Sequence, residues 1–371
     1  QIEMNKVSFD EIDIQTSVPS EYSELIETAF TAMMNSEQPS DKLMIKFLTQ
    51  ISAPLDELIK DYEKKITAEE AIFVEDETKA FGKVLQEKKL IGITSTVASI
   101  RKEALEIAQC EIVIIEEAGE LTESMNTCIL PSTMKRLIMV GDYQQLRPKV
   151  EYQLTKRPYH YDISLFERLV LNAQRSHADC LFTLSVQRRM HPQICQFVRE
   201  AFYSDPKYGK ISDAQSTHQL GIPFGLQHRV VYFMHNYEEQ KESESRSHRN
   251  IEEAKYCATL VPFFISRGYK PGDITIISLY KGQRFEIQRQ LDILFQKCKA
   301  DKNSKLHDPF GHIKSIHEIK VVVLDNFQGE ENKIIIASLT RSDSPGFVEM
   351  RNRALVTLSR AREMLVVLGN S

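Results

Sequence analysis

Two adjacent glutamates follow a short apolar run near residue 115. The run Ile112–Ile115 ends in Glu-Glu-Ala-Gly, which places Glu116 and Glu117 directly after it. If the run is a buried strand, both carboxylates lie at its carboxyl end. One acid could hold Mg²⁺ there and the next could polarise an attacking water, as nucleotide hydrolases require. The alternative is the first turn of a helix, where the helix dipole favours acidic side chains.

Two more polar turns follow apolar runs. Gly-Asp-Tyr-Gln-Gln at 141–145 is ordinary loop chemistry in isolation. Beside the acidic pair, however, Asp142 and Gln145 could sense a γ-phosphate and orient water. Gln-Arg-Arg-Met-His-Pro at 187–192 supplies Arg188 and Arg189. A guanidinium can grip phosphate charge with two donors, although an isolated basic turn is more often plain surface.

The C-terminal part of the chain repeats this arrangement. Asp-Asn-Phe-Gln-Gly-Glu-Glu at 325–331 follows an apolar run, and Ser-Arg-Ala-Arg at 359–362 precedes the last one. Arg360 and Arg362 are two residues apart and point in different directions on a helix, so at most one faces a given ligand. Both could equally be solvated. Taken alone, each of these segments is weak evidence of function.

Short apolar runs from about residue 91 onward predict the elements that position these residues. Runs that are apolar on both faces and separated by helix-length segments indicate buried parallel strands of an α/β fold. Ligands bind beyond the carboxyl ends of such strands. The runs lie at 112–115, 137–140, 181–186, 230–234, 274–277, 321–324, 334–337 and 365–368. Residues 1–90 show helical spacing instead, for example at 23–30 and 55–62.

Composition limits the possible classes. A chain of 371 residues with 42% apolar residues can form two domains. It has no apolar run of about 18 residues, so we expect a soluble protein without a membrane span. The six cysteines form no Cys-x-x-Cys pair, which argues against a zinc site. The net charge of −5 gives no support to nucleic-acid binding, which would need a local basic groove.

Taken in order, the five segments resemble motifs II to VI of superfamily 1 helicases, specifically the Upf-like branch. They read Glu-Glu-Ala-Gly, Gly-Asp-x-x-Gln-Leu-x-Pro, Gln-x-Arg-Met-His-Pro, Asp-x-Phe-Gln-Gly-x-Glu and Ser-Arg-Ala-Arg. Within the branch, the sequence at 164–169, 329–332 and 358–369 is most similar to that of the NFX-type zinc-finger-containing helicase. The resemblance covers roughly residues 91–371.

The resemblance implies two RecA-like domains that clamp ATP and Mg²⁺ between them and move a single strand across their tops. It implies a partial first domain at 91–179 and a second domain at 180–371, with 1–90 as a helical segment or an insertion of the first.

The resemblance also implies residue roles. Glu117 would be the general base, Gln145 the γ-phosphate and water sensor, and Arg189 and Arg360 the arginines that reach across from the second domain. The implied nucleotide-binding residues are Glu116, as the Mg²⁺ ligand, with Asp142, Arg188, Gly329 and Glu331. Thr94 and Thr96 would contact the nucleic-acid strand, the alternative being an ordinary strand end with β-branched residues.

Three departures from the family pattern qualify the resemblance. Glu116 stands where most helicases have Asp, and Arg188 replaces a Tyr that stacks on adenine. The phosphate-binding pattern G-x-x-x-x-G-K-[ST] is absent, since the first glycine is Gly82 and no Gly-Lys pair has a glycine five residues earlier. We therefore expect that loop upstream of Gln1, and a fragment that is nearly inactive alone.

The expected function is an ATP-dependent helicase or translocase on single-stranded RNA, with DNA as the alternative strand. From the resemblance we expect action in RNA silencing or surveillance, in the cytoplasm or alternatively the nucleus, and cysteine-rich fingers beyond Ser371. Other RNA-processing or silencing proteins are the expected protein partners. The competing hypothesis is a non-hydrolysing pseudo-helicase that binds RNA or protein.

Overall fold

The described residues form two compact units. A computed structural model describes residues 41–155, 157–205, 209–241, 247–300, 310 and 315–370. Of these, 41–93 and 101–109 belong to the first unit, and 94–100 with 110–370 to the second. The segment 1–40, where the spacing at 23–30 predicts a helix, lies outside the described residues.

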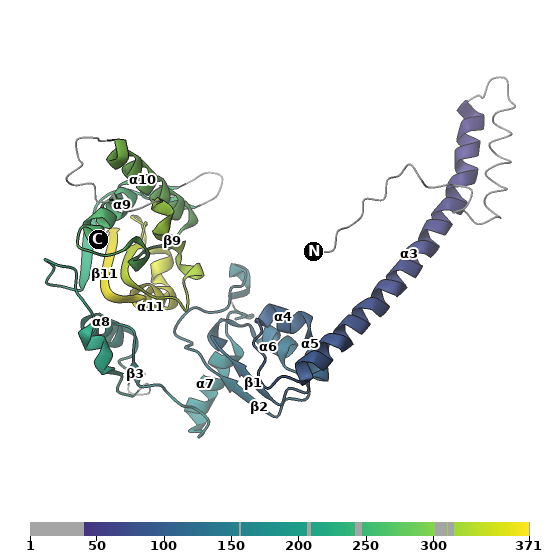
Figure 1. Cartoon of the computed structure of the whole chain (residues 1–371), viewed down its shortest axis with the longest axis horizontal. Helices are drawn as coiled ribbons and strands as arrows, with labels where there is room; N and C mark the ends of the chain where they lie inside the picture. Colours follow the sequence, from purple (N-terminus) through teal and green to yellow (C-terminus); the bar gives the residue numbers. More distant parts are fainter. Residues whose placement is uncertain are drawn as a thin grey trace. The chain divides into compact units, whose positions relative to one another are not determined.

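The first unit is built on one long helix. Helix α3 (Asp41–Gln86) runs uninterrupted through the unit (Figure 1), which confirms the expected helical segment over its described part. It packs against α5 (Lys102–Ile107). A Cβ at Gly82 would lie only 2.7 Å from Cβ of Ile107, so this close approach requires glycine. No described helix combines the length and apolar composition needed to cross a bilayer.

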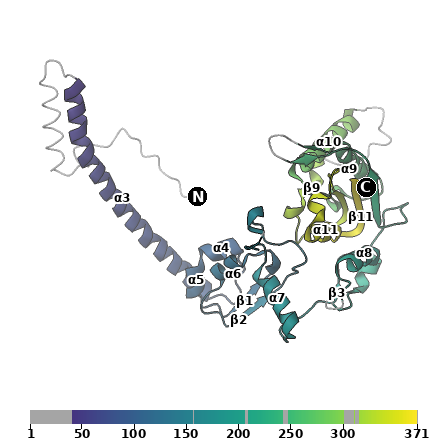
Figure 2. The same ribbon diagram turned by 180° about the vertical axis from the view of Figure 1, so that it is seen from behind.

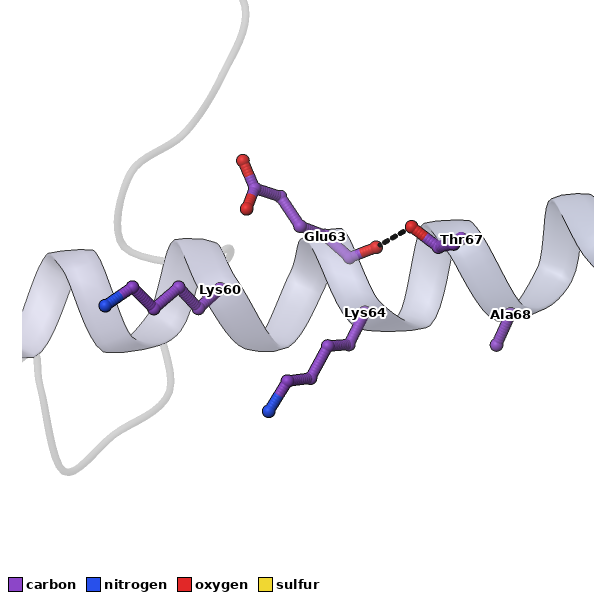
Figure 3. Close-up of a pocket in the computed structure, with 5 residues that line it drawn as sticks. All are labelled: Lys60, Glu63, Lys64, Thr67 and Ala68. Atoms are coloured by element: carbon purple, nitrogen blue, oxygen red, sulfur yellow. Dashed lines mark hydrogen bonds between the residues drawn. The ribbon is translucent and has the colours of Figure 1, made fainter.

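A shallow hollow on α3 carries no chemistry that we can assign. Figure 3 shows its lining residues, Lys60, Glu63, Lys64, Thr67 and Ala68, all of which come from this one helix. The hydroxyl of Thr67 donates to the carbonyl of Glu63 at 2.7 Å, an ordinary local bond within a helix. The candidate catalytic residues all lie in the other unit.

The second unit contains a five-stranded sheet in the order β5-β11-β10-β8-β9, in which every pair is parallel. This arrangement confirms the α/β class. The strands are β5 (Val230–His235), β8 (Ile274–Ser278), β9 (Lys320–Val323), β10 (Asn332–Ser338) and β11 (Ala361–Asn370). Each coincides with one of the apolar runs.

Helices cover both faces of this sheet. Successive residues of β10 point to opposite faces, so Ile334 and Ile336 pack in one core and Ile335 and Ala337 in another. Helices α9 (Ile251–Ile265) and α10 (Lys281–Ala300) line the first core and lie side by side (Figure 2). Helices α8 (Pro192–Phe202) and α11 (Arg351–Leu358) line the second core.

A second, two-stranded parallel sheet positions the first acidic segment. It pairs β1 (Ile112–Ile115) with β2 (Arg136–Met139), beside α4 (Ser95–Ile100), α6 (Glu123–Ile129) and α7 (Leu165–Ser176). Burial on both faces, which the apolar runs predict, is wrong here. Ile112, Ile114 and Ile138 are each about half exposed, because the described helices leave one face of these strands uncovered.

The expected strand at 181–186 is also wrong over most of its length. Only Val186–Gln187 forms a strand, β3, which pairs with β4 (Ser212–Asp213). Phe182 and Leu184 are both 87% exposed. The reason is that a strand needs a neighbour for its backbone hydrogen bonds, and among the described residues the ladder spans two positions. The short pair β6 (Gln240–Lys241) and β7 (His248–Arg249) is antiparallel.

A buried carboxylate ties α9 to the large sheet. Glu253 is fully buried and accepts hydrogen bonds from Nε2 of His235 at 2.8 Å and from the backbone N–H of Thr340 at 3.0 Å. The hydroxyl of Ser338 also donates to it. These contacts join the ends of β5 and β10 to the first turn of α9.

Replacing Glu253 by alanine is expected to lower the free energy of unfolding by about 3–5 kcal/mol, because the change leaves its buried partners unpaired. Chemical denaturation measures this loss. The matched control is Glu252→Ala, a neighbouring glutamate whose half-exposed side chain pairs with Lys255. That variant should differ from the wild type by less than about 0.5 kcal/mol. Equal losses in both variants would contradict a structural role for the buried network.

Candidate active site

The acidic pair follows β1 as predicted, and its second residue has an unusual backbone. Glu117 adopts φ 50° and ψ 40°, the left-handed region that non-glycine residues rarely occupy. Glu117 directly precedes a single 3-10 turn, Ala118–Glu120. The alternative prediction, that the two glutamates begin a helix, therefore also describes the local backbone. Both Glu116 and Glu117 are exposed. Backbone strain of this kind is concentrated at functional sites.

The Gly-Asp turn lies directly against this acidic turn. The N–H of Ala118 donates to the carbonyl of Val140 at 2.9 Å. A Cβ at Gly141 would lie 3.0 Å from the backbone nitrogen of Ala118, and one at Gly119 would lie 3.2 Å from the carbonyl oxygen of Asp142. The two glycines therefore allow the turns after β1 and β2 to meet backbone to backbone.

Arg360 meets the Gly-Asp turn through the side chain of Gln145. Nη2 of Arg360 donates to Oε1 of Gln145 at 2.8 Å, and Nε2 of Gln145 donates to Oδ2 of Asp142 at 3.3 Å. Residues 142, 145 and 360 thus form one chain of hydrogen bonds. The structure brings the carboxylate of Asp142 and the amide of Gln145 to a guanidinium that lies 215 positions after Gln145 in the sequence.

Arg360 is almost fully buried, with 1% of the residue's surface exposed. It donates to the carbonyls of Val356 at 3.2 Å and Glu330 at 3.3 Å. Burial, and then repulsion from Arg189, lower the pKa of Arg360 to about 10, while the charge of Glu117 opposes the shift. Arg360 is still protonated at neutral pH. A cation that is held without a full countercharge is suited to an anionic ligand.

Arg189 and Glu331 form the neighbouring ion pair. Nε of Arg189 lies 2.6 Å from Oε2 of Glu331, and Nη1 of Arg362 lies 3.5 Å from the other oxygen of this carboxylate. Arg189 also donates to the carbonyl of Ser359 at 3.4 Å, the residue before Arg360. The turn before β10 and the start of β11 therefore hold Arg189 close to Arg360.

The turn that contains Gly329 faces the acidic pair. Nε2 of Gln328 donates to Oε2 of Glu117 at 3.3 Å. Gly329 has φ 75°, and a Cβ there would lie 4.0 Å from Oε1 of Glu117. The side-chain oxygen of Gln328 is buried without a hydrogen-bond partner among the described residues. Such an atom is costly unless a water or a ligand pairs with it.

The residues around Glu117 fit a divalent cation. Burial, and then the negative charge of Glu117, raise the pKa of Glu120, and Asp325 raises it further. A cation near these carboxylates would relieve that crowding. Among the described residues, no three His, Cys, Asp or Glu side chains converge as a complete metal cage. Mg²⁺ needs no such cage, because one or two carboxylates plus substrate phosphates and waters satisfy it.

Three predicted site residues are not joined to this cluster. Arg188 is exposed and makes no hydrogen bond or ion pair with any described residue. Thr94 and Thr96 lie at the start of α4, where the hydroxyl of Thr94 accepts from the N–H of Val97 at 3.4 Å. The alternative of a strand end is therefore wrong for these threonines. Their nucleic-acid role and the nucleotide role of Arg188 stay predictions.

Four residues that received no role from the sequence support the cluster. Gln187 accepts from the N–H groups of Arg189, at 3.0 Å, and Met190, at 2.9 Å, and so fixes the arginine turn. Tyr203 donates to Asp142, and Asn352 donates to the loop that contains Gln145. Gln187 and Gln328 lie within the motifs at 187–192 and 325–331, so the sequence could have indicated that they belong to the site. Nothing in the sequence points to Tyr203 or Asn352.

Comparisons with known proteins decide the family. Two family models, each described as AAA domain, match residues 161–371 and residues 8–151. The NFX1-type zinc finger-containing protein 1 of Mus musculus is 32% identical over 292 residues, which cover 77% of this chain and 14% of that protein. The Drosophila melanogaster regulator of nonsense transcripts 1 homolog is 31% identical over 264 residues, which cover 70% and 20%. The chain belongs to the Upf-like superfamily 1 helicases.

Two further matches cover similar shares of the chain. The helicase required for RNAi-mediated heterochromatin assembly 1 of Schizosaccharomyces pombe is 32% identical over 295 residues, covering 78% of this chain and 26% of that protein. The crystal structure of arterivirus nonstructural protein 10 (helicase) is 12% identical and covers 69% of this chain and 38% of that one, with a TM-score of 0.33. The chain spans about a quarter or less of the length of these curated relatives.

Proposed function

We propose that the full-length gene product is an ATP-driven translocase or helicase on single-stranded RNA, in which this chain supplies most of the motor. The observation that carries the proposal is the hydrogen-bonded line Arg360–Gln145–Asp142. This line links the segments 141–145 and 359–362, whose side chains are of the types that phosphoryl transfer needs. Arg189 and Glu117 lie beside the line.

In the proposed mechanism, Glu117 is the general base and Gln145 orients the water that attacks the γ-phosphorus. The water oxygen forms the new bond to phosphorus, its proton passes to Glu117, and ADP leaves. Arg189 and Arg360 stabilise the charge that develops on the phosphoryl oxygens. Glu116 would hold Mg²⁺, which supplies charge neutralisation at the phosphates when bound. Glu331 and Gly329 would contact the nucleotide, as would Asp142 and Arg188.

Both proposed arginine fingers have protein partners in the structure. Arg360 donates to Gln145, and Arg189 pairs with Glu331. A γ-phosphate that arrives between them would compete for both guanidinium groups. Each round of binding and hydrolysis would then exchange these contacts. We propose that this exchange moves the domain at 180–371 against the one at 91–179 and so drives movement along the strand.

RNA is the proposed strand, with Thr94 and Thr96 among its phosphate contacts. The proposal is supported by the names of two relatives, which refer to RNAi-mediated heterochromatin assembly and to nonsense transcripts. Silencing or surveillance of RNA is the corresponding process, in the cytoplasm or, for a heterochromatin role, the nucleus. Strand binding through phosphates would be insensitive to sequence and would weaken as salt rises.

The competing function is a pseudo-helicase that binds RNA without hydrolysis. One observation favours it, since the 371 residues contain no G-x-x-x-x-G-K-[ST] pattern. Against it stands the contact network, because a protein that hydrolyses nothing has no physical need to bury a cation against a water-orienting amide.

The deciding experiment measures ATP hydrolysis by the full-length gene product, with and without a single-stranded RNA of random sequence. We expect hydrolysis that requires Mg²⁺ and increases at least about tenfold with RNA, as binding of the strand completes the site. The same assay with single-stranded DNA distinguishes the two strands. Retained RNA binding without any hydrolysis would establish the pseudo-helicase instead.

A further inference from the structure

Asn352 lies where it can set the position of Gln145. It is the second residue of α11, and its Nδ2 faces three successive carbonyl oxygens of the Gly-Asp loop. The distances are 3.2 Å to Tyr143, 2.9 Å to Gln144 and 2.6 Å to Gln145. We propose that Asn352 is a positioning residue, which aligns the water-orienting amide of Gln145 with Arg360. This inference rests on the proposed function.

The loop alone does not explain why its carbonyls converge. Oδ1 of Asp142 accepts from the N–H of Gln144 at 3.0 Å, and the N–H of Gln145 donates to the carbonyl of Asp142 at 3.0 Å. These bonds curl the backbone and pair the N–H groups of Gln144 and Gln145, but they use none of the next three carbonyl oxygens as acceptors. Partly buried carbonyls need donors, and the amide of Asn352 supplies them.

The loop is attached to the same core as α11. Leu146, the residue after Gln145, is buried among side chains of α8 and α11, which include Val198 and Leu355. Nε2 of Gln144 donates to the carbonyl of Phe202 at 3.1 Å. These contacts hold the loop against α8 and α11. Asn352 adds what packing cannot, a directional bond to the backbone of Gln145.

Helix α11 connects both partners of Gln145. Asn352 lies in its first turn, and Arg360 follows two residues after its last residue, Leu358. Eight residues of α-helix span about 12 Å, the length of a short rod. The backbone of Gln145 is thus held at one end of the rod, while its side chain receives the guanidinium at the other.

The helix is also joined to the turn that faces Glu117. Nη2 of Arg353 donates to Oδ2 of Asp325 at 3.0 Å, three residues before Gln328. The side chains of Asn352 and Arg353 therefore connect α11 to two segments of the active site. Loss of the Asn352 bond should disturb the position of Gln145 and leave Gly329 and Glu331, which lie on a different turn, in place.

Asn352→Asp is the informative substitution. It keeps the size of the side chain but replaces the donor by a carboxylate that faces three carbonyl oxygens. Displacement of a positioned group by about 1 Å can cost about 10² in rate. For RNA-stimulated hydrolysis by the full-length gene product, we expect kcat to fall about 10- to 100-fold, while KM for ATP changes less than about threefold. Asn172→Asp, at an exposed asparagine on α7, should match the wild type.

A double-mutant cycle separates positioning from general destabilisation. If Asn352 acts through Gln145, then Asn352→Asp should change kcat by less than about twofold in a Gln145→Ala background. Asn352→Leu, which has neither donor nor charge, should repeat the loss of Asn352→Asp in the wild-type background. If the carboxylate of the Asn352→Asp variant prevents folding, kcat of the Asn352→Leu variant tests the proposal instead. Thermal melting of each variant checks the fold.

Hydrogen exchange gives a reading that needs no hydrolysis. In Asn352→Asp, backbone amides of residues 143–146 should exchange at least about tenfold faster than in the wild type, with the rest of the second unit unchanged. Unchanged exchange, wild-type kcat, a KM effect as large as the kcat effect, or additivity with Gln145→Ala would each overturn the proposal. An inactive wild type with faster exchange in the variant would refute the proposed enzyme and leave the positioning role standing.

Discussion

Replacing Arg360 by alanine is expected to lower kcat for ATP hydrolysis about 10³- to 10⁵-fold, the typical cost of losing an arginine finger. The guanidinium is buried and is bound to Gln145, so the change removes both the charge at the phosphate and the partner of the water-orienting amide. Steady-state hydrolysis by the full-length gene product measures the effect. The control is Arg168→Ala, an exposed arginine of α7 that pairs with Glu123.

Arg360→Lys adds a test with a defined pH dependence. Burial and Arg189 lower the pKa of Arg360, and the same surroundings would lower the pKa of a lysine, which begins about two units lower. The charged form is present below the folded-state pKa and is lost above it. The lysine variant should therefore keep a small residual activity that falls as pH rises from 7 to 9, while the wild type keeps its charge. A lysine variant with wild-type activity at every pH would contradict the finger role.

Glu117→Gln is expected to lower kcat about 10²- to 10⁴-fold, because glutamine cannot accept the proton of the attacking water. The amide has the same shape and can keep the contact with Gln328, so ATP should still bind. Fluorescent-nucleotide binding and hydrolysis, measured on one preparation, separate the two properties. Equal loss of binding and turnover would show that Glu117 holds the nucleotide and is not the base.

Two neighbouring glutamates provide the controls for this substitution. Glu111→Gln, at an exposed residue before β1 that pairs with Lys135, should leave hydrolysis unchanged. Glu116→Gln should raise the Mg²⁺ concentration needed for half-maximal rate, since Glu116 is the proposed ligand. This pattern distinguishes a base from a metal ligand at adjacent positions. Identical behaviour of Glu116→Gln and Glu117→Gln would remove that distinction.

The large parallel sheet could be predicted from the sequence because its strands are buried on both faces. Ile274, Ile276 and Ile277 are fully buried in β8, and a short, continuous, β-branched run is typical of a strand in this position. The same rule failed at 181–186 and on β1. An apolar run indicates what could be buried, whereas actual burial depends on neighbouring strands and helices that local sequence does not specify.

The α/β class and the residue types of the candidate site could be predicted from the sequence alone, because short motifs place each polar group directly after or before a strand. Glu117, Gln145, Arg189, Arg360 and Glu331 were all named from such motifs, and their roles stay predictions. Which of these residues are in contact, and which other residues hold them, could be seen only in the folded chain. Arg360 contacts Gln145 across 215 positions, and Asn352 contacts the same residue across 207. Such contacts depend on where helices pack, and an asparagine that binds three distant carbonyls looks the same in sequence as one that faces water.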